Sequence, residues 1–307
     1  MKTGDKFIRK FFMEVEGANN TYQIASPLTL ELDITRGAWQ SVSFADFSIY
    51  NLAESVRSDI YLDWINQFEK PRKITLWGGY ESWKNNGVSS PTNGLYLIFN
   101  GQIRSAQSGR DGPSWVTKIA AWDGGWDIQN TAISYNQAAG SQFIDVLNNV
   151  IKKYANLSIG YIDPTLDFTL IRGLSFHGSV HDILTTLANK LYADYFVDNM
   201  NVYFVSKGQP IPGMIGNLVS ISSADGLIDT PIKQKFYVSF NMIFEPRIQV
   251  GQAVKLESLE LENNGTYTIR GLEHHGVISD AVDGGCTSRI TCFYPNAFQK
   301  VSPSVLN

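Results

Sequence analysis

The sequence predicts a mainly β protein with a small α/β insert. Two patterns lead to this fold class. Apolar and polar residues alternate with period two toward both ends of the chain, whereas apolar residues recur at helical spacing between about 138 and 210. Alternation of this kind is typical of antiparallel sheets with one buried and one wetter face. A length of 307 residues suits two or three modest domains.

Strands dominate the predicted N-terminal part. Their alternating stretches are 7–16, 28–36, 44–50, 73–77, 95–104 and 115–123. One helix, at about 51–66, interrupts them, because Asn51 can cap its start and Glu54 follows three residues later. The apolar positions on one side of this helix are Leu52, Val56, Ile60 and Trp64.

Two helices and a hairpin are predicted for the insert. The first helix starts at Ser141 in a capping-box-like pattern, and the second starts at Ser179. The segments 192–197 and 202–205 then form a hairpin around a turn at 198–201.

The Pro- and Gly-rich linker at 207–213 is the clearest boundary. Beyond it, strands return at 236–244, 253–258, 265–272 and 287–294. We therefore divide the chain into a first β domain (1–137), an α/β insert (138–210) and a second β domain (211–307). The two β-rich ends could be related units.

Composition excludes several classes of protein. The 25 basic and 29 acidic residues leave a net charge of −4, which argues against a dedicated nucleic-acid binder. No window approaches 18 consecutive apolar residues, and the start has no apolar segment of a secretory signal. Charged residues make up only 18%, below the roughly 25% of typical soluble domains, so we expect partners to cover part of the surface.

Cys286 and Cys292 fall in one predicted strand, on the same face and roughly 20 Å apart. They cannot bridge each other at that separation. Two reduced thiols suit a protein that folds in a reducing cytosol.

No motif for catalysis, phosphate binding or a metal site stands out. His177 and His181 have a metal-compatible spacing, but Ser179 between them caps the helix and leaves His177 outside it. His274 and His275 are adjacent, so a strand would send their rings to opposite faces. We predict no catalytic residue, cofactor or metal ligand, and hence no enzyme.

The glycine-rich stretch 122–126 is predicted to be a tight strand-to-strand turn, supported by the carboxylate of Asp123. A phosphate-binding loop would need a helix directly after the glycines. No cap or helical stripe follows them.

Aromatic residues are abundant, with 7 Trp, 14 Tyr and 17 Phe. Trp77, Trp83 or Trp115 could stack on sugars, but aromatics at alternating strand positions more often build cores and protein interfaces. Trp83 lies in a polar loop, and we predict it as the best single candidate for an interface loop.

Three stretches follow one another around the helical insert. The first is 28–36 with 45–52, the second is 98–103 with 119–125, and the third is 243–256 with 265–269 and 272–276. In this order they resemble the baseplate hub proteins of tailed bacteriophages, the group of the T4-type central hub and the late-control gene D proteins. The likeness runs from about residue 28 to residue 293. The sequence departs from the family pattern at 284–287, where an aromatic often follows the glycines.

This resemblance implies a fold of two tube-type antiparallel β-barrel domains that flank the α/β domain. Three copies would present six barrels in a ring and seat a threefold spike on a sixfold tail tube. The implied partners are two further copies of the chain, a tail tube or distal tail protein, a central spike or needle protein and other baseplate proteins. DNA would only pass through the lumen, and no membrane insertion is implied.

The implied location is the tail baseplate of a virion assembled in the bacterial host cytoplasm. The family-motif residues are structural in this family, and no active site is carried over. These residues are Phe99, Gly101, Asp123, Gly124, Gly125, Pro246, Gly251, Tyr267, His274 and Gly276.

Two other functions remain open. One is a β-rich carbohydrate-binding module for host attachment, whose Trp fluorescence should shift with host glycans. The other is a tail-associated peptidoglycan hydrolase, which should clear a cell-wall suspension and lose this activity when one carboxylate is replaced.

Overall fold

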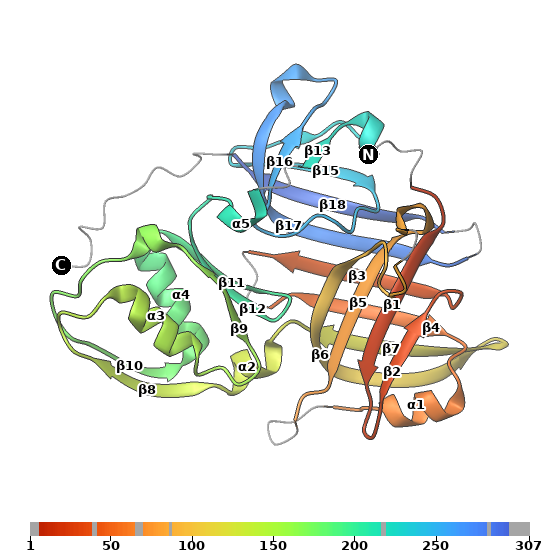
Figure 1. Cartoon of the computed structure of the whole chain (residues 1–307), viewed down its shortest axis with the longest axis horizontal. Helices are drawn as coiled ribbons and strands as arrows, with labels where there is room; N and C mark the ends of the chain where they lie inside the picture. Colours follow the sequence, from red (N-terminus) through yellow and green to blue (C-terminus); the bar gives the residue numbers. More distant parts are fainter. Residues whose placement is uncertain are drawn as a thin grey trace.

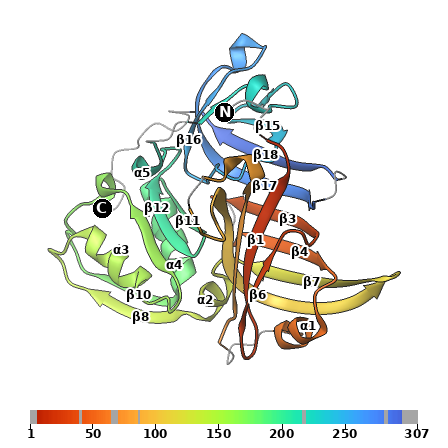
Figure 2. The same ribbon diagram turned by 45° about the vertical axis from the view of Figure 1, so that its right-hand side comes forward.

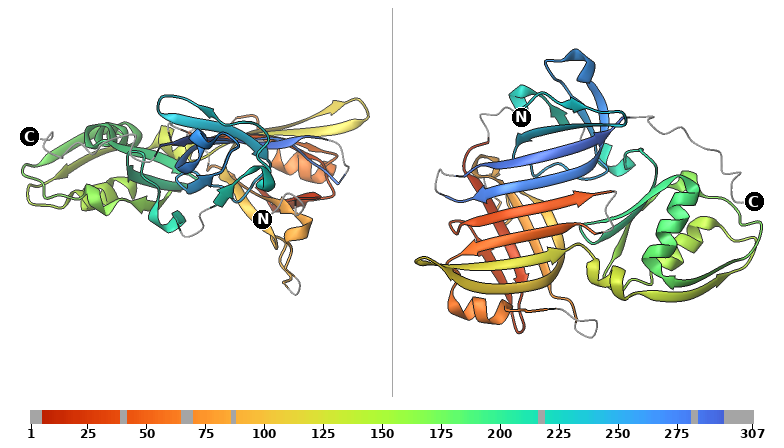
Figure 3. Two further views of the ribbon diagram at one scale, coloured as in Figure 1. Left: turned by 90° about the horizontal axis from the view of Figure 1, so that it is seen from above. Right: turned by 180° about the vertical axis from the view of Figure 1, so that it is seen from behind.

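The computed structural model describes residues 6–38, 42–64, 70–85, 88–215, 219–280 and 284–294. It shows a flattened molecule with two β units stacked at one end and an α/β unit beside them (Figures 1 and 3). We call strands β1 to β7 the first β unit, elements α2 to β12 the insert, and elements α5 to β18 the second β unit.

The first β unit is an antiparallel sheet with the strand order β3-β4-β7-β6-β5-β1-β2. The predicted alternation is present. Leu30, Leu32 and Ile34 of β3 are buried, and Glu31 and Asp33 between them are exposed. The strands are β1 (Arg9–Glu16), β2 (Thr21–Ala25), β3 (Leu30–Gly37), β4 (Phe44–Tyr50), β5 (Lys73–Tyr80), β6 (Leu95–Asp111) and β7 (Ser114–Trp122).

Helix α1 (Glu54–Ile60) is shorter than the predicted 51–66. Asn51 does not cap it, because Asn51 has a left-handed backbone and Ala53 occupies the N-cap position. The helix ends at Tyr61 because Leu62 pairs through its backbone with Ala106 of β6, with N–O distances of 2.8 and 2.7 Å. Residues 65 and 66 of the predicted helix lie outside the described residues.

The insert buries one face of each of two helices, α3 and α4, in a core of its own. Both predicted helices are present, with Ser179 at the N-cap position of α4 and His177 in the preceding strand. The predicted start of the first helix at Ser141 needs correction, because Gln142 occupies its N-cap position and the hydroxyl of Ser141 donates to the carbonyl of Ala138 instead. The strands form the sheets β11-β12-β9 and β10-β8. The elements are α2 (Gly125–Asn130), β8 (Ala132–Gln137), α3 (Phe143–Ile151), β9 (Ser158–Ile162), β10 (Leu174–Ser179), α4 (Val180–Leu191), β11 (Ala193–Asp198) and β12 (Asn201–Ser206).

Two features of the insert differ from the sequence prediction. The glycine stretch is not a strand-to-strand turn, because Gly124 has a left-handed backbone (φ 70°) and helix α2 begins directly after it. Strand β8 lies before the predicted boundary at 137, yet it pairs with β10 of the insert.

The second β unit follows the predicted strands, and β17 runs six residues beyond its predicted end. Its order is β14-β15-β18-β17, with β16 on β17 and β13 parallel to β16. The elements are α5 (Pro212–Ile215), β13 (Val219–Ile221), β14 (Ile232–Lys233), β15 (Tyr237–Ile243), β16 (Ala253–Leu256), β17 (Gly265–Ile278) and β18 (Cys286–Phe293). Short 3-10 turns occur at Glu81–Trp83, Pro164–Leu166, Ser223–Asp225 and Leu261–Asn263.

The two β units share one continuous sheet rather than forming two separate closed barrels. Strand β3 pairs antiparallel with β17, from Gly37 opposite Gly271 to Leu30 opposite Ile278. In the described residues this makes a 13-stranded sheet with end strands β14 and β2, and the sheet does not close. Figures 1 and 2 show β18, β17, β3 and β4 side by side across the joint. The resemblance implies that the first β unit is a closed barrel. Over the described ranges it is not closed, because the outer edge of β3 pairs with β17 of the second unit.

The buried cores cross the unit boundaries. Phe244 and Ile278 of the second unit belong to the core of the first, and Phe196 and Tyr203 of the insert belong to the core of the second. Among the described residues, no helix is long and apolar enough to cross a membrane.

Candidate functional site: the joints between the units

The joint between the first β unit and the insert contains a buried ion pair. Arg36 of β3 donates through Nε and Nη2 to the carboxylate of Asp198 in β11, at 2.8 and 2.6 Å, and through Nη1 to the carbonyl of Ile98 at 2.7 Å. Both side chains are almost fully buried. Burial alone would lower the pKa of Arg36, but Asp198 raises it above its ordinary value. Bidentate geometry of this kind fixes orientation as well as charge.

Two buried carboxylates extend the same joint. Asp123, directly after β7, accepts the backbone N–H groups of Asn199 and Met200 in the β11–β12 turn, at 2.5 and 2.7 Å. The predicted role of Asp123 therefore needs correction, because it supports a turn in another unit rather than its own. Burial, and then the charge of Asp198, raise the pKa of Asp123 to about 8.

Asp127 of α2 is fully buried and also serves this joint. It accepts the backbone N–H groups of Ala155 and Asn156 at 3.0 and 2.9 Å, and the side-chain amide of Gln102 in β6 at 2.8 Å. The first β unit is thus tied to the insert through carboxylates on both sides of the glycine pair.

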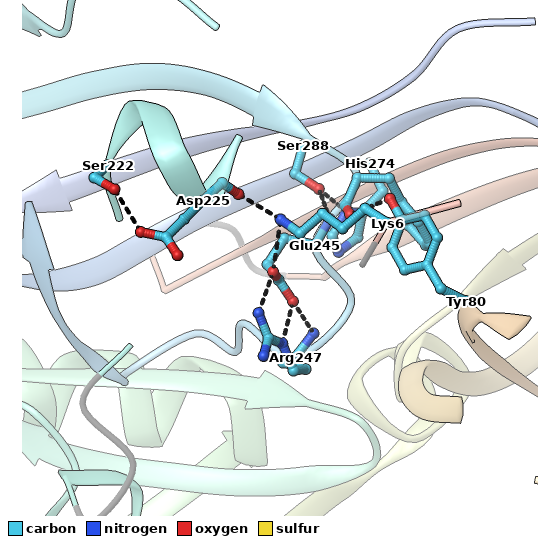
Figure 4. A network of polar contacts seen from close by, with 9 residues as sticks. Lys6, Tyr80, Ser222, Asp225, Glu245, Arg247, His274 and Ser288 are labelled. Carbon is cyan, nitrogen blue, oxygen red and sulfur yellow. Dashed lines mark hydrogen bonds and ion pairs between the residues drawn. The ribbon is translucent and has the colours of Figure 1, made fainter. Parts of the chain in front are cut away.

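The joint between the two β units holds a second buried network, drawn in Figure 4. The ammonium of Lys6 lies 3.0 Å from the carboxylate of Glu245 and donates to the carbonyl of Asp225 at 2.6 Å. Glu245 also accepts from Nε and Nη2 of Arg247, at 2.6 and 2.5 Å. Burial alone would raise the pKa of Glu245, but Arg247 and Lys6 hold it below its ordinary value.

His274 and Ser288 complete this network in the strand pair β17–β18. Oγ of Ser288 accepts the backbone N–H of Glu245 at 2.9 Å and lies 2.8 Å from Nδ1 of His274. The hydroxyl proton of Ser288 is then available for Nδ1, which suits a neutral imidazole. Beside it, the hydroxyl of Tyr80 donates to the carbonyl of Phe244 at 2.8 Å and ties β5 to the second unit.

The joint between the insert and the second β unit is mainly apolar. Phe196 and Tyr203 stack with ring centroids 5.1 Å apart inside the core of the second unit. Arg270 of β17 lies 2.5 Å from the carboxylate of Asp194 in β11. A cavity of about 290 Å³ adjoins this pair, lined by α4 and β11 residues such as His181.

A strand pattern recurs in the two β units. Arg104 in β6 and Arg270 in β17 are each the extra residue of a β-bulge, and each follows an isoleucine. The residue two places before each arginine pairs with an aromatic residue on the next strand. Gln102 pairs with Trp122 in the first unit, and Thr268 pairs with Phe293 in the second. Each guanidinium carbon lies 5.8 Å from the centroid of that ring.

The correspondence continues across neighbouring strands. Trp122 is opposite Phe44 of β4, and Phe293 is opposite Tyr237 of β15. On the other side of the bulged strands, β5 begins its pairing with Lys73 opposite Gln102, and β16 begins its pairing with Ala253 opposite Thr268. The four strands β5-β6-β7-β4 therefore match β16-β17-β18-β15 in order, direction and register. The two β-rich ends of the chain are built on the same strand plan.

A family model described as baseplate hub gp41 matches residues 10–281. The chain belongs to this baseplate hub family. It is a structural protein of a phage tail baseplate and a virion-associated component. No curated protein sequence gives a significant match.

Solved structures of tail proteins have a similar fold. The 43 kDa tail protein of prophage MuSo2 from Shewanella oneidensis superposes with a TM-score of 0.60 at 11% identity, covering 94% of this chain and 100% of that chain. A tail protein from Neisseria meningitidis MC58 gives 0.59 at 11% identity, with 92% and 96% covered. The E. coli c3393 protein, described as a type VI secretion component similar to the T4 tail proteins gp27 and gp5, gives 0.59 at 6% identity, with 95% and 79% covered.

The motif residues predicted for the hub chain do not meet in one pocket. Asp123, Gly124 and Gly125 lie at the joint with the insert, and His274 and Gly276 lie where β17 meets β18 and β3. The others are buried in their own units: Phe99 and Gly101 in the first, and Pro246, Gly251 and Tyr267 in the second.

Three of these glycines stand where a side chain would collide with neighbours. A Cβ at Gly101 would lie 2.6 Å from the carbonyl oxygen of Trp122, and one at Gly276 would lie 2.1 Å from that of Gly285. Gly251 has a φ of 85°, and its Cβ would lie 2.5 Å from Ile211. Their roles are in backbone packing.

The prediction for Trp83 needs correction. Its side chain is 8% exposed, with Tyr80 at 4.8 Å and Tyr96 at 5.7 Å between ring centroids, and the guanidinium of Arg247 lies 4.8 Å from its ring. Trp83 is therefore part of the core next to the Glu245 network, although polar residues surround it in the sequence.

The described residues contain no cluster of three or more His, Cys, Asp or Glu that could hold a metal ion. Cys286 and Cys292 are free, buried and on the same face of β18, as predicted. Burial raises the pKa of Cys286 to about 11 and that of Cys292 further. Neither thiol is activated.

Sequence reasoning missed the charged residues of the joints. Arg36 had a visible signal, because the alternation of β3 places it on the buried face in line with Leu32 and Ile34. Its partner Asp198 had none, because it stands 162 positions away at the end of β11.

Proposed function

We propose that the chain forms the trimeric hub of a tail baseplate, in which three copies present six pseudo-equivalent β units in a ring. The observation that carries this proposal is the matching strand register of the two β units, from the bulge at Arg104 and Arg270 outward. Two like units in each of three chains would give a nearly sixfold ring from a threefold assembly. Such a ring would seat a sixfold tail tube on one side and a threefold central spike on the other.

The buried joints suit this role. Arg36–Asp198 and Lys6–Glu245 fix the insert and the two β units relative to one another. A ring that transmits load between tube and spike needs subunits that do not flex at these joints. We propose the tail tube or distal tail protein, the spike or needle protein and other baseplate proteins as its partners.

We also propose that the hub is not an enzyme and that DNA only passes through its lumen. The buried carboxylates of the joints accept hydrogen bonds from the chain itself. They are Asp123, Asp127 and Glu245. A net charge of −4 would weaken adhesion of DNA to the ring. Assembly would take place in the bacterial host cytoplasm, and no membrane insertion is proposed.

The first test is the solution mass of the purified chain, measured by light scattering at several concentrations. The expected result is about 103 kDa, three times the 34.2 kDa of one chain. A mass of one chain at every concentration, unchanged when purified tail tube protein is added, would contradict the trimer.

The second test separates the hub from the two other functions. The expected result is no clearing of a cell-wall suspension and no shift of Trp fluorescence with host glycans. Clearing that disappears on replacement of one carboxylate would favour the hydrolase, and a fluorescence shift would favour the carbohydrate-binding module.

A further inference from the structure

The joint between the two β units of one chain uses two edges. One is strand β3, and the other is the outer edge of the C-terminal half of β17. Asp33 of β3 stands opposite His275, and Ile34 stands opposite His274. Because the two β units share one strand plan, each of these edges has a counterpart in the other unit.

The counterpart of β3 is β14. On β4, Asp33 and Ile34 pair with Asp46 and Ala45, and on β15 Ile232 and Lys233 pair with Ser239 and Val238. Asp46 comes two residues after Phe44, which stands opposite Trp122, and Ser239 comes two residues after Tyr237, which stands opposite Phe293. Ile232 therefore occupies the position of Asp33, and Lys233 that of Ile34.

The counterpart of the outer half of β17 is the C-terminal half of β6. Counting from the bulge arginines, His274 and His275 are the fourth and fifth residues after Arg270, and Ser108 and Gly109 are the fourth and fifth after Arg104. The partner strands agree, because Ser108 stands opposite Thr117 in β7 as His274 stands opposite Ser288 in β18.

Both counterpart edges lack a strand partner in the described part of the chain. Strand β14 pairs with β15 alone, and the outer edge of β6 pairs only at Ala106, where Leu62 bridges to it. The side chain of Ile232 is 62% exposed. Unpaired edges of this kind invite pairing with another chain. Strand β14 lies on β15, and Figure 1 shows β15 and the β6–β7 hairpin at opposite sides of the joined sheet.

We propose that β14 of one copy pairs antiparallel with the outer edge of β6 in the next copy, with Ile232 opposite Gly109 and Lys233 opposite Ser108. This contact would repeat between chains the joint that β3 and β17 make within a chain. The residues opposite Ile232 and Lys233 would be Gly109 and Ser108, which are small and uncharged, so neither pair would set two bulky or two like-charged side chains against each other. The partner is a second copy of this chain, and the proposal rests on the hub function proposed above.

A head-to-tail contact of this kind uses different surfaces on the two partners and closes into a ring when its rotation allows. In a ring of three chains, three joints within chains and three joints between chains would alternate.

Engineered disulfides test the register in the full-length chain. Residues directly opposite on antiparallel strands have Cα atoms about 4.5–5.5 Å apart, within the range a disulfide requires. The two in-register double variants are Ile232→Cys with Gly109→Cys, and Lys233→Cys with Ser108→Cys. No atom lies within 4 Å of a Cβ built at Gly109, so that position accepts the change. The native thiols are buried and give little background.

The matched control recombines the same substitutions out of register, as Ile232→Cys with Ser108→Cys. Mild oxidation of both in-register variants should give a covalent trimer on a non-reducing gel, whereas the control and the single variants should remain monomers. Each variant is first checked for a wild-type melting profile, and two in-register pairs keep the test decisive if one fails to fold.

The outcomes separate this inference from the proposed function. A wild-type trimer without in-register cross-links would overturn the β14–β6 contact and leave the trimeric hub standing. A cross-linked ladder extending beyond trimers would support the contact and contradict a closed ring of three. A wild-type chain that stays a monomer with and without tail tube protein, together with variants that give no cross-links, would overturn both.

Discussion

Arg36 and Asp198 form a bidentate ion pair in which both side chains are nearly inaccessible to solvent, at 1% and 3% exposure. One residue belongs to β3, which joins the two β units, and the other ends β11 of the insert. All three units therefore meet around a single buried charge pair.

Breaking this pair should be costly. Removing one partner of a buried ion pair leaves an uncompensated charge and costs about 3–5 kcal/mol. We expect Asp198→Asn and Arg36→Met each to lower the free energy of unfolding by about this amount, and the double variant to lose less than the sum. Chemical denaturation of the four proteins measures the coupling.

An exposed ion pair provides the control. Lys84 and Glu81 lie 2.8 Å apart at 51% and 41% side-chain exposure, so Glu81→Gln should cost less than about 1 kcal/mol. Additive losses in the Arg36 and Asp198 variants would show that the two residues do not act as a pair.

His274 should make the protein less stable in acid. Burial, and then the charge of Arg36, lower the pKa of His274 to about 3. The unfolded chain takes up a proton near pH 6.5, while the folded imidazole stays neutral. Stability from this group is therefore complete above about pH 6.5 and is lost as the pH falls toward 3, by at most about 1.4 kcal/mol per pH unit.

The measurement is the free energy of unfolding between pH 7 and 4 for wild type, His274→Gln and His275→Gln. His275 is the neighbouring residue with 75% side-chain exposure. The His274 variant should show a shallower loss in acid, and the His275 variant should keep the wild-type slope. Equal slopes in all three proteins would rule out His274 as the source.

The strand plan could be predicted from the sequence because it depends on local patterns. Period-two alternation located β4 and β7 to within a residue, and capping signals located α4. The orientation of His274 and His275 followed from the same period, and the structure confirms it with one ring buried and the other exposed.

The joints could not be predicted, because they depend on contacts between distant segments. Nothing near β3 indicates that its outer edge pairs with β17. Short strands such as β14 are invisible to periodicity, since two residues cannot show a period. The burial of Trp83 was missed for a similar reason, because its neighbours Tyr96 and Arg247 come from other segments of the chain.

Trp83→Ala should destabilise the fold. The side chain is 8% exposed and packs between Tyr80, Tyr96 and Arg247, and replacing a buried Trp with Ala costs about 3–5 kcal/mol. The control is Trp64→Ala, because Trp64 is 58% exposed, and it should cost well under half as much. Urea denaturation of both variants measures the difference. Equal midpoints would place the indole of Trp83 outside the core.

Gly276→Ala tests the backbone where β17 leaves its pairing with β18. Gly276 has a φ of 143°, and a Cβ there would lie 2.1 Å from the carbonyl oxygen of Gly285 and 2.5 Å from the Cα of Cys286. Both atoms belong to the backbone at the start of β18, so β17 and β18 must move apart to admit a methyl group. We expect a loss of more than about 1 kcal/mol.

The matched control for this change is Gly109→Ala, at a position where the added Cβ meets no atom within 4 Å and the backbone is not left-handed. Its effect on stability should stay within about 0.5 kcal/mol. Denaturant midpoints compare the two variants. A Gly276 variant as stable as the Gly109 variant would mean that β17 and β18 can part at this point without cost. The end of the β17–β18 pairing, where Gly276 stands opposite Cys286, would then not depend on the glycine.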